Sequence, residues 1–162
     1  MIFVENDGGR AAAGFKGQTG DCVTRAIAIA LAHSTDNHED AGETYRSVYD
    51  ALFQSALNDR PHMAKLQLRY GKNARRHASP RDGMSRRIYE RYLLSLGWKW
   101  TPTMKVGQGC TVHLRADELP QGRLVVAVSK HLTAVIDGVI HDTHDPSRGG
   151  TRCVYGYYSR ND

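Results

Sequence analysis

Three side chains in this sequence have the types and the order that thiol chemistry needs: Cys22, His131 and Asp142. Cys22 follows a glycine-rich stretch and begins a run of apolar residues that is typical of a buried helix. In the first turn of a helix the backbone N–H groups are unpaired and the helix dipole is positive, so the thiolate is favoured over the thiol. Because the thiolate is the reactive form, Cys22 is the candidate nucleophile. The alternative for a free cysteine is a small, inert core residue.

His131 lies at the start of a short apolar run that an Asp137-Gly138 pair turns back on itself. Such a pair between two apolar runs indicates a two-residue hairpin turn, which fixes the register of both strands. Counted from the turn, His131, Asp142 and His144 share one face, with Asp142 diagonal to His131 at roughly 7–8 Å between backbones. A carboxylate there would hold the imidazole in the orientation that a catalytic base needs. The alternative is a polar strand face that only meets solvent.

The elements that position these residues are predicted to form an α+β domain, with helices first and an antiparallel sheet after them. The segment 6–20 is predicted as loop, and Asp21 is expected to cap the helix that follows. Arg60-Pro61 is expected to end the second helix, and Gly97 the third. Apolar spacing predicts helices over Cys22–Ala32, Asp40–Asn58 and Met84–Leu96. Strands are predicted over Val112–Leu114, Leu124–Val128, Leu132–Ile136, Val139–Asp142 and Cys153–Tyr158.

The composition is that of one globular domain over residues 1–162, with 40% hydrophobic and 24% charged residues. The net charge of +5 permits an acidic partner without requiring one. The most basic stretch is 65–91, and its first part, 65–83, is expected to be a basic loop inserted between two helices.

The cysteines and the apolar segments bear on the cellular compartment. Three cysteines, Cys22, Cys110 and Cys153, are odd in number and far apart, which argues against a disulfide framework and for a reducing compartment. The apolar start, Met1 to Val4, is too short for a signal peptide, and no run approaches the ~18 residues of a membrane helix. A cytoplasmic protein with no membrane partner is expected.

The segment Gln18-Thr19-Gly20-Asp21-Cys22 resembles the Gln-x-x-Asp/Glu-Cys signature of bacteriocin-processing, papain-like cysteine peptidases. His131, its apolar strand and Asp142 are similar to the papain-superfamily order of Cys, His and Asp or Asn. The resemblance covers about 17–32 and 123–158. It implies a papain-like fold, in which the cysteine heads a central helix packed on an antiparallel sheet. It also implies the roles of nucleophile for Cys22, base for His131, orienting residue for Asp142 and oxyanion donor for Gln18.

Two positions depart from the pattern of that group. Val23 follows the cysteine where the group usually has glycine. The group often places its catalytic aspartate in an Asp-Pro pair, which Asp145-Pro146 matches, whereas the hairpin register favours Asp142. Asp145 has the opposite parity and could orient His131 only if the chain turns after His144, which Pro146 allows. We follow the register, because it rests on strand geometry.

A metal site is one alternative, because histidine and aspartate are good ligands for zinc or iron. The hairpin holds a cluster of such residues: His131, His141, Asp142, His144 and Asp145. However, His141 is predicted to point to the face opposite His131 and His144, so the cluster cannot converge on one ion. No metal and no cofactor are therefore expected.

A nucleic-acid-binding module is another alternative, because 65–91 combines basic residues with Tyr70 and Tyr89 for stacking. At helical spacing, Arg86, Arg87 and Arg91 are more simply the wet face of the third helix. A papain-like scaffold without activity is a third alternative, although each catalytic role has an occupant here. The sequence therefore favours an enzyme that acts on a protein or peptide.

The chemistry predicted is thiol acyl transfer, in which Cys22 attacks a carbonyl carbon and the oxyanion is stabilised by backbone and side-chain donors. Cleavage of a peptide, isopeptide or side-chain amide bond, and transamidation, all follow this course. The sequence does not choose among these substrates. The small size would suit an accessory protein of a phage or bacterium.

Overall fold

The computed structural model describes residues 1–17, 19–32, 38–72 and 78–160. Its helices are α1 (Cys22–Leu31), α2 (His38–Asn58), α3 (Arg60–Tyr70) and α4 (Arg86–Ser95). Its strands are β1 (Ile2–Glu5), β2 (Ala78–Ser79), β3 (Gly83–Met84), β4 (Lys99–Pro102), β5 (Arg123–Val128), β6 (His131–Ile136), β7 (Val139–Asp142) and β8 (Val154–Ser159). The α+β class predicted from the sequence is confirmed.

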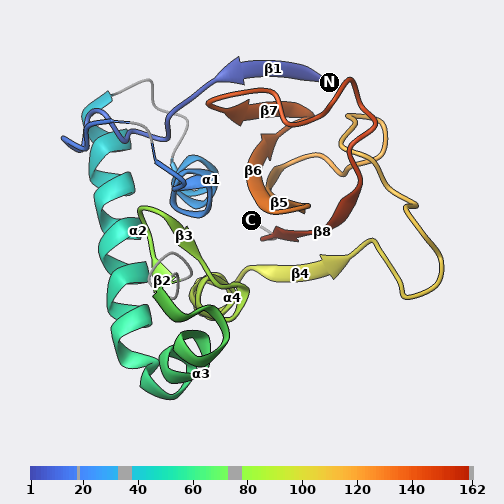
Figure 1. The fold of residues 1–162 in the computed structure, drawn as a ribbon. Coiled ribbons are helices and arrows are strands. Elements are labelled where there is room, and N and C mark those ends of the chain that lie inside the picture. Colours follow the sequence, from blue (N-terminus) through green and yellow to red (C-terminus); the bar gives the residue numbers. More distant parts are fainter. Residues whose placement is uncertain (18, 33–37, 73–77, 161–162) are drawn as a thin grey trace.

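One six-stranded sheet, in the order β1-β7-β6-β5-β8-β4, is the framework of the fold. Figure 1 shows β5, β6 and β8 curled together, with α1 beside β6 and the other helices on the same side as α1. Neighbouring strands run antiparallel except β1, which pairs in parallel with β7. The antiparallel sheet predicted after the helices is present in β5 to β8, and the segment Ile2–Glu5 adds a parallel edge strand that the sequence does not predict.

Apolar side chains form two cores, and alternate residues of β5 belong to different ones. Val125 packs with α1, α2 and α4, whereas Val126 packs with Val135, Ile140 and Leu114. Successive residues of a strand point to opposite faces, so the two cores lie on opposite faces of the sheet. Helix α1 is buried along nearly its whole length, as its surrounding apolar residues predict. The first core therefore fixes where the N-terminus of α1 meets the sheet.

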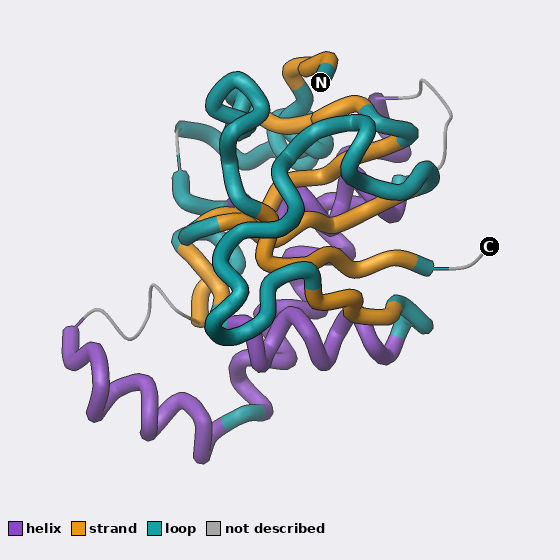
Figure 2. The backbone as a smooth tube through the Cα atoms, turned by 90° about the vertical axis from the view of Figure 1, so that its right-hand side faces the viewer, coloured by secondary structure: helices purple, strands orange, loops and turns teal. Residues whose placement is uncertain are grey.

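The three predicted helices correspond to α1, α2 and α4, with ends within two residues of those predicted. Helix α3 is not predicted from the sequence, because Pro61 indicates an end there. In the structure Pro61 lies in the first turn of α3, where a missing backbone N–H costs nothing. The segment 65–83 is consequently not a single loop, since it begins within α3 and ends in the β2–β3 hairpin. Figure 2 shows α3 extending away from the sheet.

The β6–β7 hairpin has the register that the Asp137-Gly138 turn predicts. Ile136 pairs with Val139, and Val135 with Ile140. Both turn residues have positive φ, 47° at Asp137 and 77° at Gly138, as a two-residue type I′ turn requires. This turn brings the first residue of β6 and the last residue of β7 to the same end of the hairpin.

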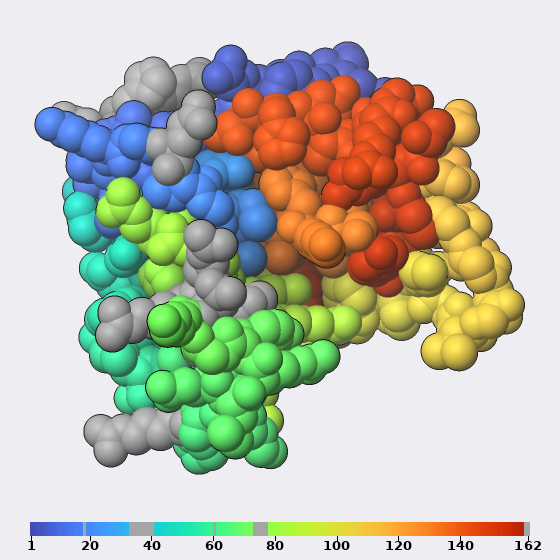
Figure 3. Space-filling model, viewed as in Figure 1, coloured from blue at the N-terminus to red at the C-terminus, as the bar shows by residue number. Residues whose placement is uncertain are grey.

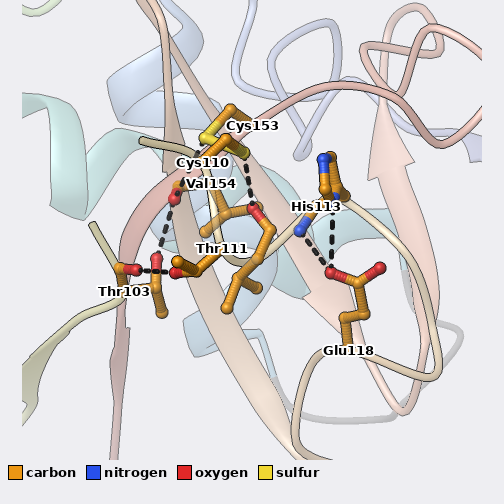
Figure 4. Close-up of a disulfide and its surroundings, with 8 residues drawn as sticks. Thr103, Cys110, Thr111, His113, Glu118, Cys153 and Val154 are labelled. Carbon is orange, nitrogen blue, oxygen red and sulfur yellow. Dashed lines mark hydrogen bonds and ion pairs between the residues drawn. A yellow bond between two sulfur atoms is a disulfide. The ribbon is translucent and has the colours of Figure 1, made fainter. Parts of the chain in front are cut away.

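Cys110 and Cys153 form a disulfide, with their Cα atoms 5.7 Å apart. The expectation of a chain without disulfides is therefore wrong, and the cysteine count no longer supports a reducing compartment. The two residues are 43 positions apart in sequence, and an isolated bridge between His113 and Cys153 brings the segments together. Figure 4 shows the disulfide beside a hydrogen bond from the Thr111 hydroxyl to the Thr103 carbonyl, 2.7 Å long.

A segment between β4 and β5 projects from the sheet, and the disulfide ties its residue Cys110 to Cys153, directly before β8. In Figure 3 this segment, in yellow, extends from the right-hand side of the molecule. Its residues Met104 and Val106 are exposed. The predicted strand over Val112–Leu114 is reduced here to the single bridge at His113. None of the helices in the described ranges is both long and apolar enough to cross a membrane.

Candidate active site

Cys22 is the first residue of α1 and lies half-buried at the edge of the helix–sheet core. Its backbone N–H, in the first turn, has no partner within the helix. Thr24 links the start of α1 to the β2–β3 hairpin, because its buried hydroxyl donates to the Pro80 carbonyl at 2.6 Å. The tip of the β2–β3 hairpin also packs closely on Gly20, where a Cβ would lie 3.1 Å from the Asp82 carbonyl oxygen. Cys22 thus sits on a constrained backbone.

His131 joins Cys22 to Asp142. The imidazole Nε2 and Asp142 Oδ2 are 2.7 Å apart, and Asp142 is 2% exposed. The same ring is hydrogen-bonded to the Cys22 thiol, and the Leu132 backbone N–H also bonds to that sulfur. Because Nε2 is taken by Asp142, the nitrogen left for Cys22 is Nδ1. The structure therefore brings together the three residues that the hairpin register and the helix start select.

The charge states of the three side chains reinforce one another. Burial alone would raise the pKa of Cys22, but the hydrogen bond and positive charge of His131 outweigh it, so the pKa is lowered. Burial opposes protonation of His131, yet its bonds to Asp142 and Cys22 raise its pKa to about 9. Burial likewise opposes ionisation of Asp142, but His131 holds the pKa of this carboxyl below its usual value. These directions favour a thiolate–imidazolium pair at neutral pH.

The sequence also marks Asp145, His144 and Gln18 as candidates for the site. Asp145 does not contact His131, and its Oδ1 instead accepts the Ser147 backbone N–H at 2.8 Å. His144 is exposed beside His131, with the ring centroids 5.1 Å apart. Gln18 lies outside the described residues, so its expected place at the oxyanion has no structural test.

Arg25 is a site residue that sequence reasoning misses. It is 7% exposed and reaches from α1 to Asp142 on β7, with Nη2 and Oδ1 3.2 Å apart. Its Nη1 donates to Asp21, which is not the helix cap that the sequence predicts, since its side chain makes no capping hydrogen bond. The available signal is an arginine within an otherwise apolar helix, because a buried charge requires partners.

An open cleft of about 1240 Å³ exposes this site. One part of its wall is apolar or aromatic and includes Met84, Trp100 and Tyr155. Trp100 is fixed there, with the Arg86 guanidinium 4.2 Å from its ring centroid and the Tyr158 ring 4.7 Å away. The cleft therefore offers apolar contacts next to Cys22.

His141 does not join the site. Burial and the positive charge of Arg123 lower its pKa, and its Nδ1 is buried without a hydrogen-bond partner in the described residues. In the part of the chain that the structure describes, no group of three or more histidine, cysteine, aspartate or glutamate side chains is placed to hold a metal ion.

Comparison with known proteins leaves the site geometry as the basis for function. No protein-family model matches the chain, and no curated protein or solved structure is significantly similar to it.

Proposed function

We propose that this protein is a papain-like cysteine hydrolase that cleaves a peptide, isopeptide or side-chain amide bond. One observation carries the proposal: His131 is bonded on one side to Cys22 and on the other to the buried carboxylate of Asp142. In acyl-transfer enzymes a nucleophile contacts a base, and the base contacts a third group that orients it. The position of Cys22 at a helix N-terminus agrees with it.

The mechanism begins with attack of the Cys22 thiolate on the substrate carbonyl carbon, which forms a C–S bond and an oxyanion. The Cys22 backbone N–H is available to the oxyanion, and Gln18 is the proposed second donor. Imidazolium His131 protonates the leaving amine as the C–N bond breaks. His131 then takes a proton from water, whose oxygen attacks the thioester. The C–S bond breaks, the acid leaves and the thiolate–imidazolium pair is restored.

The cleft favours a protein or peptide as substrate. Met84, Trp100 and Tyr155 offer apolar contacts to side chains near the scissile bond. Transfer of the acyl group to an amine in place of water would use the same residues. No cofactor takes part in these steps.

Binding of nucleic acid is less well supported, because the arginines of α4 are engaged. Arg87 and Arg91 both pair with the buried Asp59, at 3.3 and 3.4 Å. Arg86 pairs with Glu90 at 2.9 Å and covers the face of Trp100. These pairs reduce the charge that α4 offers to a phosphate backbone.

The test is intact-mass labelling with electrophilic probes built on peptides and on a ubiquitin-like protein. We expect one adduct per chain on Cys22, and none in Cys22→Ala. Unfolded protein provides the matched control, since it keeps the thiol and loses the arrangement. Labelling that survives in Cys22→Ala, or that is equally fast in the unfolded chain, would contradict the proposal. The probes that react fastest would also indicate the substrate class.

A further inference from the structure

Arg25 is a charged residue inside the first core. Helix α1 is surrounded by apolar side chains, and its other buried members include Ile27 and Ala28, which are fully inaccessible. A guanidinium at 7% exposure is costly unless each charge near it is matched. Its partners therefore indicate what this position does.

The first partner is Asp142, whose two carboxylate oxygens are used differently. Oδ1 accepts from Arg25 Nη2 at 3.2 Å and from the Thr143 backbone N–H at 2.7 Å. Oδ2 is left for His131 Nε2. Two donors on one oxygen and one on the other fix the plane of the carboxylate. Arg25 thereby ties the orientation of Asp142, on β7, to the helix that carries Cys22.

The second partner is Asp21, which anchors the other side of the guanidinium. Asp21 is 1% exposed and accepts from Arg25 Nη1 through Oδ1. Its Oδ2 accepts from the Tyr45 hydroxyl at 2.5 Å and faces Arg10 Nε at 3.2 Å. The carboxylate is thus held by three side chains from the N-terminal loop, α1 and α2. Among the described residues, the titratable and charged groups that face Cys22, Arg25 and their partners are Asp21, Asp142, Arg10, Tyr45, His131 and Tyr89.

We propose that Arg25 is a positioning residue of the Cys22–His131–Asp142 site. It acts through Asp142, whose Oδ2 it keeps directed at His131, and it adds a positive charge close to the Cys22 thiolate. This role deepens the proposed function and rests on it. Without the guanidinium, the ion pair between the Cys22 thiolate and the His131 imidazolium is expected to be weaker, although all three site residues are still present.

The experiment measures the rate of Cys22 alkylation by iodoacetamide against pH, which needs no knowledge of the substrate. In Arg25→Gln we expect the midpoint to rise by about one pH unit, since the variant loses both a charge that lowers the pKa of Cys22 and a donor that holds Asp142 toward His131. At pH values below the midpoint of the unsubstituted protein, the rate would then fall by about tenfold. Arg25→Lys keeps the charge and should retain more of the low-pH reactivity than Arg25→Gln.

The matched control is Arg123→Gln. Arg123 also binds α1, but at its other end, through the carbonyls of Ala30 and Ala32. This change should alter stability without moving the midpoint. If Arg25→Gln does not fold, the double variant Asp21→Asn/Arg25→Gln removes both buried charges together and takes its place.

The outcomes separate the two proposals. A folded Arg25→Gln or double variant with the midpoint of the unsubstituted protein would overturn the role of Arg25, and so would an equal shift in Arg123→Gln. If the unsubstituted protein itself shows the pH profile of an ordinary thiol, the proposed function fails, and the role of Arg25 with it.

Discussion

The protein places its three cysteines in two regions that use sulfur in opposite ways. Cys22 lies at the start of a buried helix, bonded to an imidazole that a buried carboxylate holds. Cys110, in the segment between β4 and β5, and Cys153, directly before β8, are joined to each other. The same side chain is thus expected to be reactive in one setting and structural in the other. The difference lies in the neighbours, since only Cys22 has a helix N-terminus and a proton acceptor beside it.

Substitution of Asp142 should have the largest effect, and this effect should be confined to the region of Cys22. We expect Asp142→Ala to lower turnover by about 100- to 10,000-fold, because His131 loses the group that orients it for proton transfer. Asp142→Asn should be milder, since an amide oxygen can still accept from the ring. Asp145→Ala should cost about 1 kcal/mol of stability, as for the loss of one hydrogen bond. Kinetics with a peptide substrate, together with urea unfolding, tests all three. A large loss of turnover in Asp145→Ala alone would favour the Asp-Pro pattern over the hairpin register.

Removal of the disulfide should affect the other region. The bond closes a loop of 43 residues, which corresponds to about 4 kcal/mol of unfolding free energy if chain entropy dominates. In a protein of this size that lowers Tm by about 10 °C. The double variant Cys110→Ser/Cys153→Ser should therefore melt earlier while Cys22 keeps its reactivity at low pH.

Cys22→Ser is the matched control for that variant, because it should melt close to the unsubstituted protein. A thiol titration adds a second check: the denatured, unreduced chain should show one thiol, and the reduced chain three. Three thiols before reduction would show that Cys110 and Cys153 are not joined.

Gln18→Ala should have a smaller effect, restricted to turnover. An oxyanion donor acts on the transition state, and loss of one typically costs about 100- to 1000-fold in rate. Alkylation of Cys22 passes through no oxyanion and should stay nearly unchanged. Equal turnover in Gln18→Ala and the unsubstituted protein would remove Gln18 from the mechanism.

The parts of the site that local sequence determines are the parts that could be predicted. The Asp137-Gly138 turn demands positive φ at both residues, so it sets the register and places Asp142 with His131. The apolar run after Cys22 requires burial on every side and so predicts a buried helix.

The parts that depend on distant segments could not be predicted. Arg25 and Asp142 are 117 residues apart, and no pattern near either residue indicates the contact. The disulfide depends on the same kind of tertiary contact, made by the bridge between His113 and Cys153. Of the two contacts of Arg25, local sequence indicates the one with Asp21, since residues four apart face each other on a helix.

The central claim is that Cys22 exists as a thiolate paired with imidazolium His131, and the pH dependence of its alkylation tests this most directly. The pKa of Cys22 is lowered and that of His131 is raised to about 9, so the pair exists between the two values. Alkylation of Cys22 should be well advanced below pH 8, and turnover should fall as His131 loses its proton near pH 9. His131→Ala should move the alkylation midpoint to about 8.5 or higher, because burial of the thiol then acts without the opposing charge of the imidazolium. A midpoint near 8.5 in the unsubstituted protein, unchanged by His131→Ala, would contradict the account.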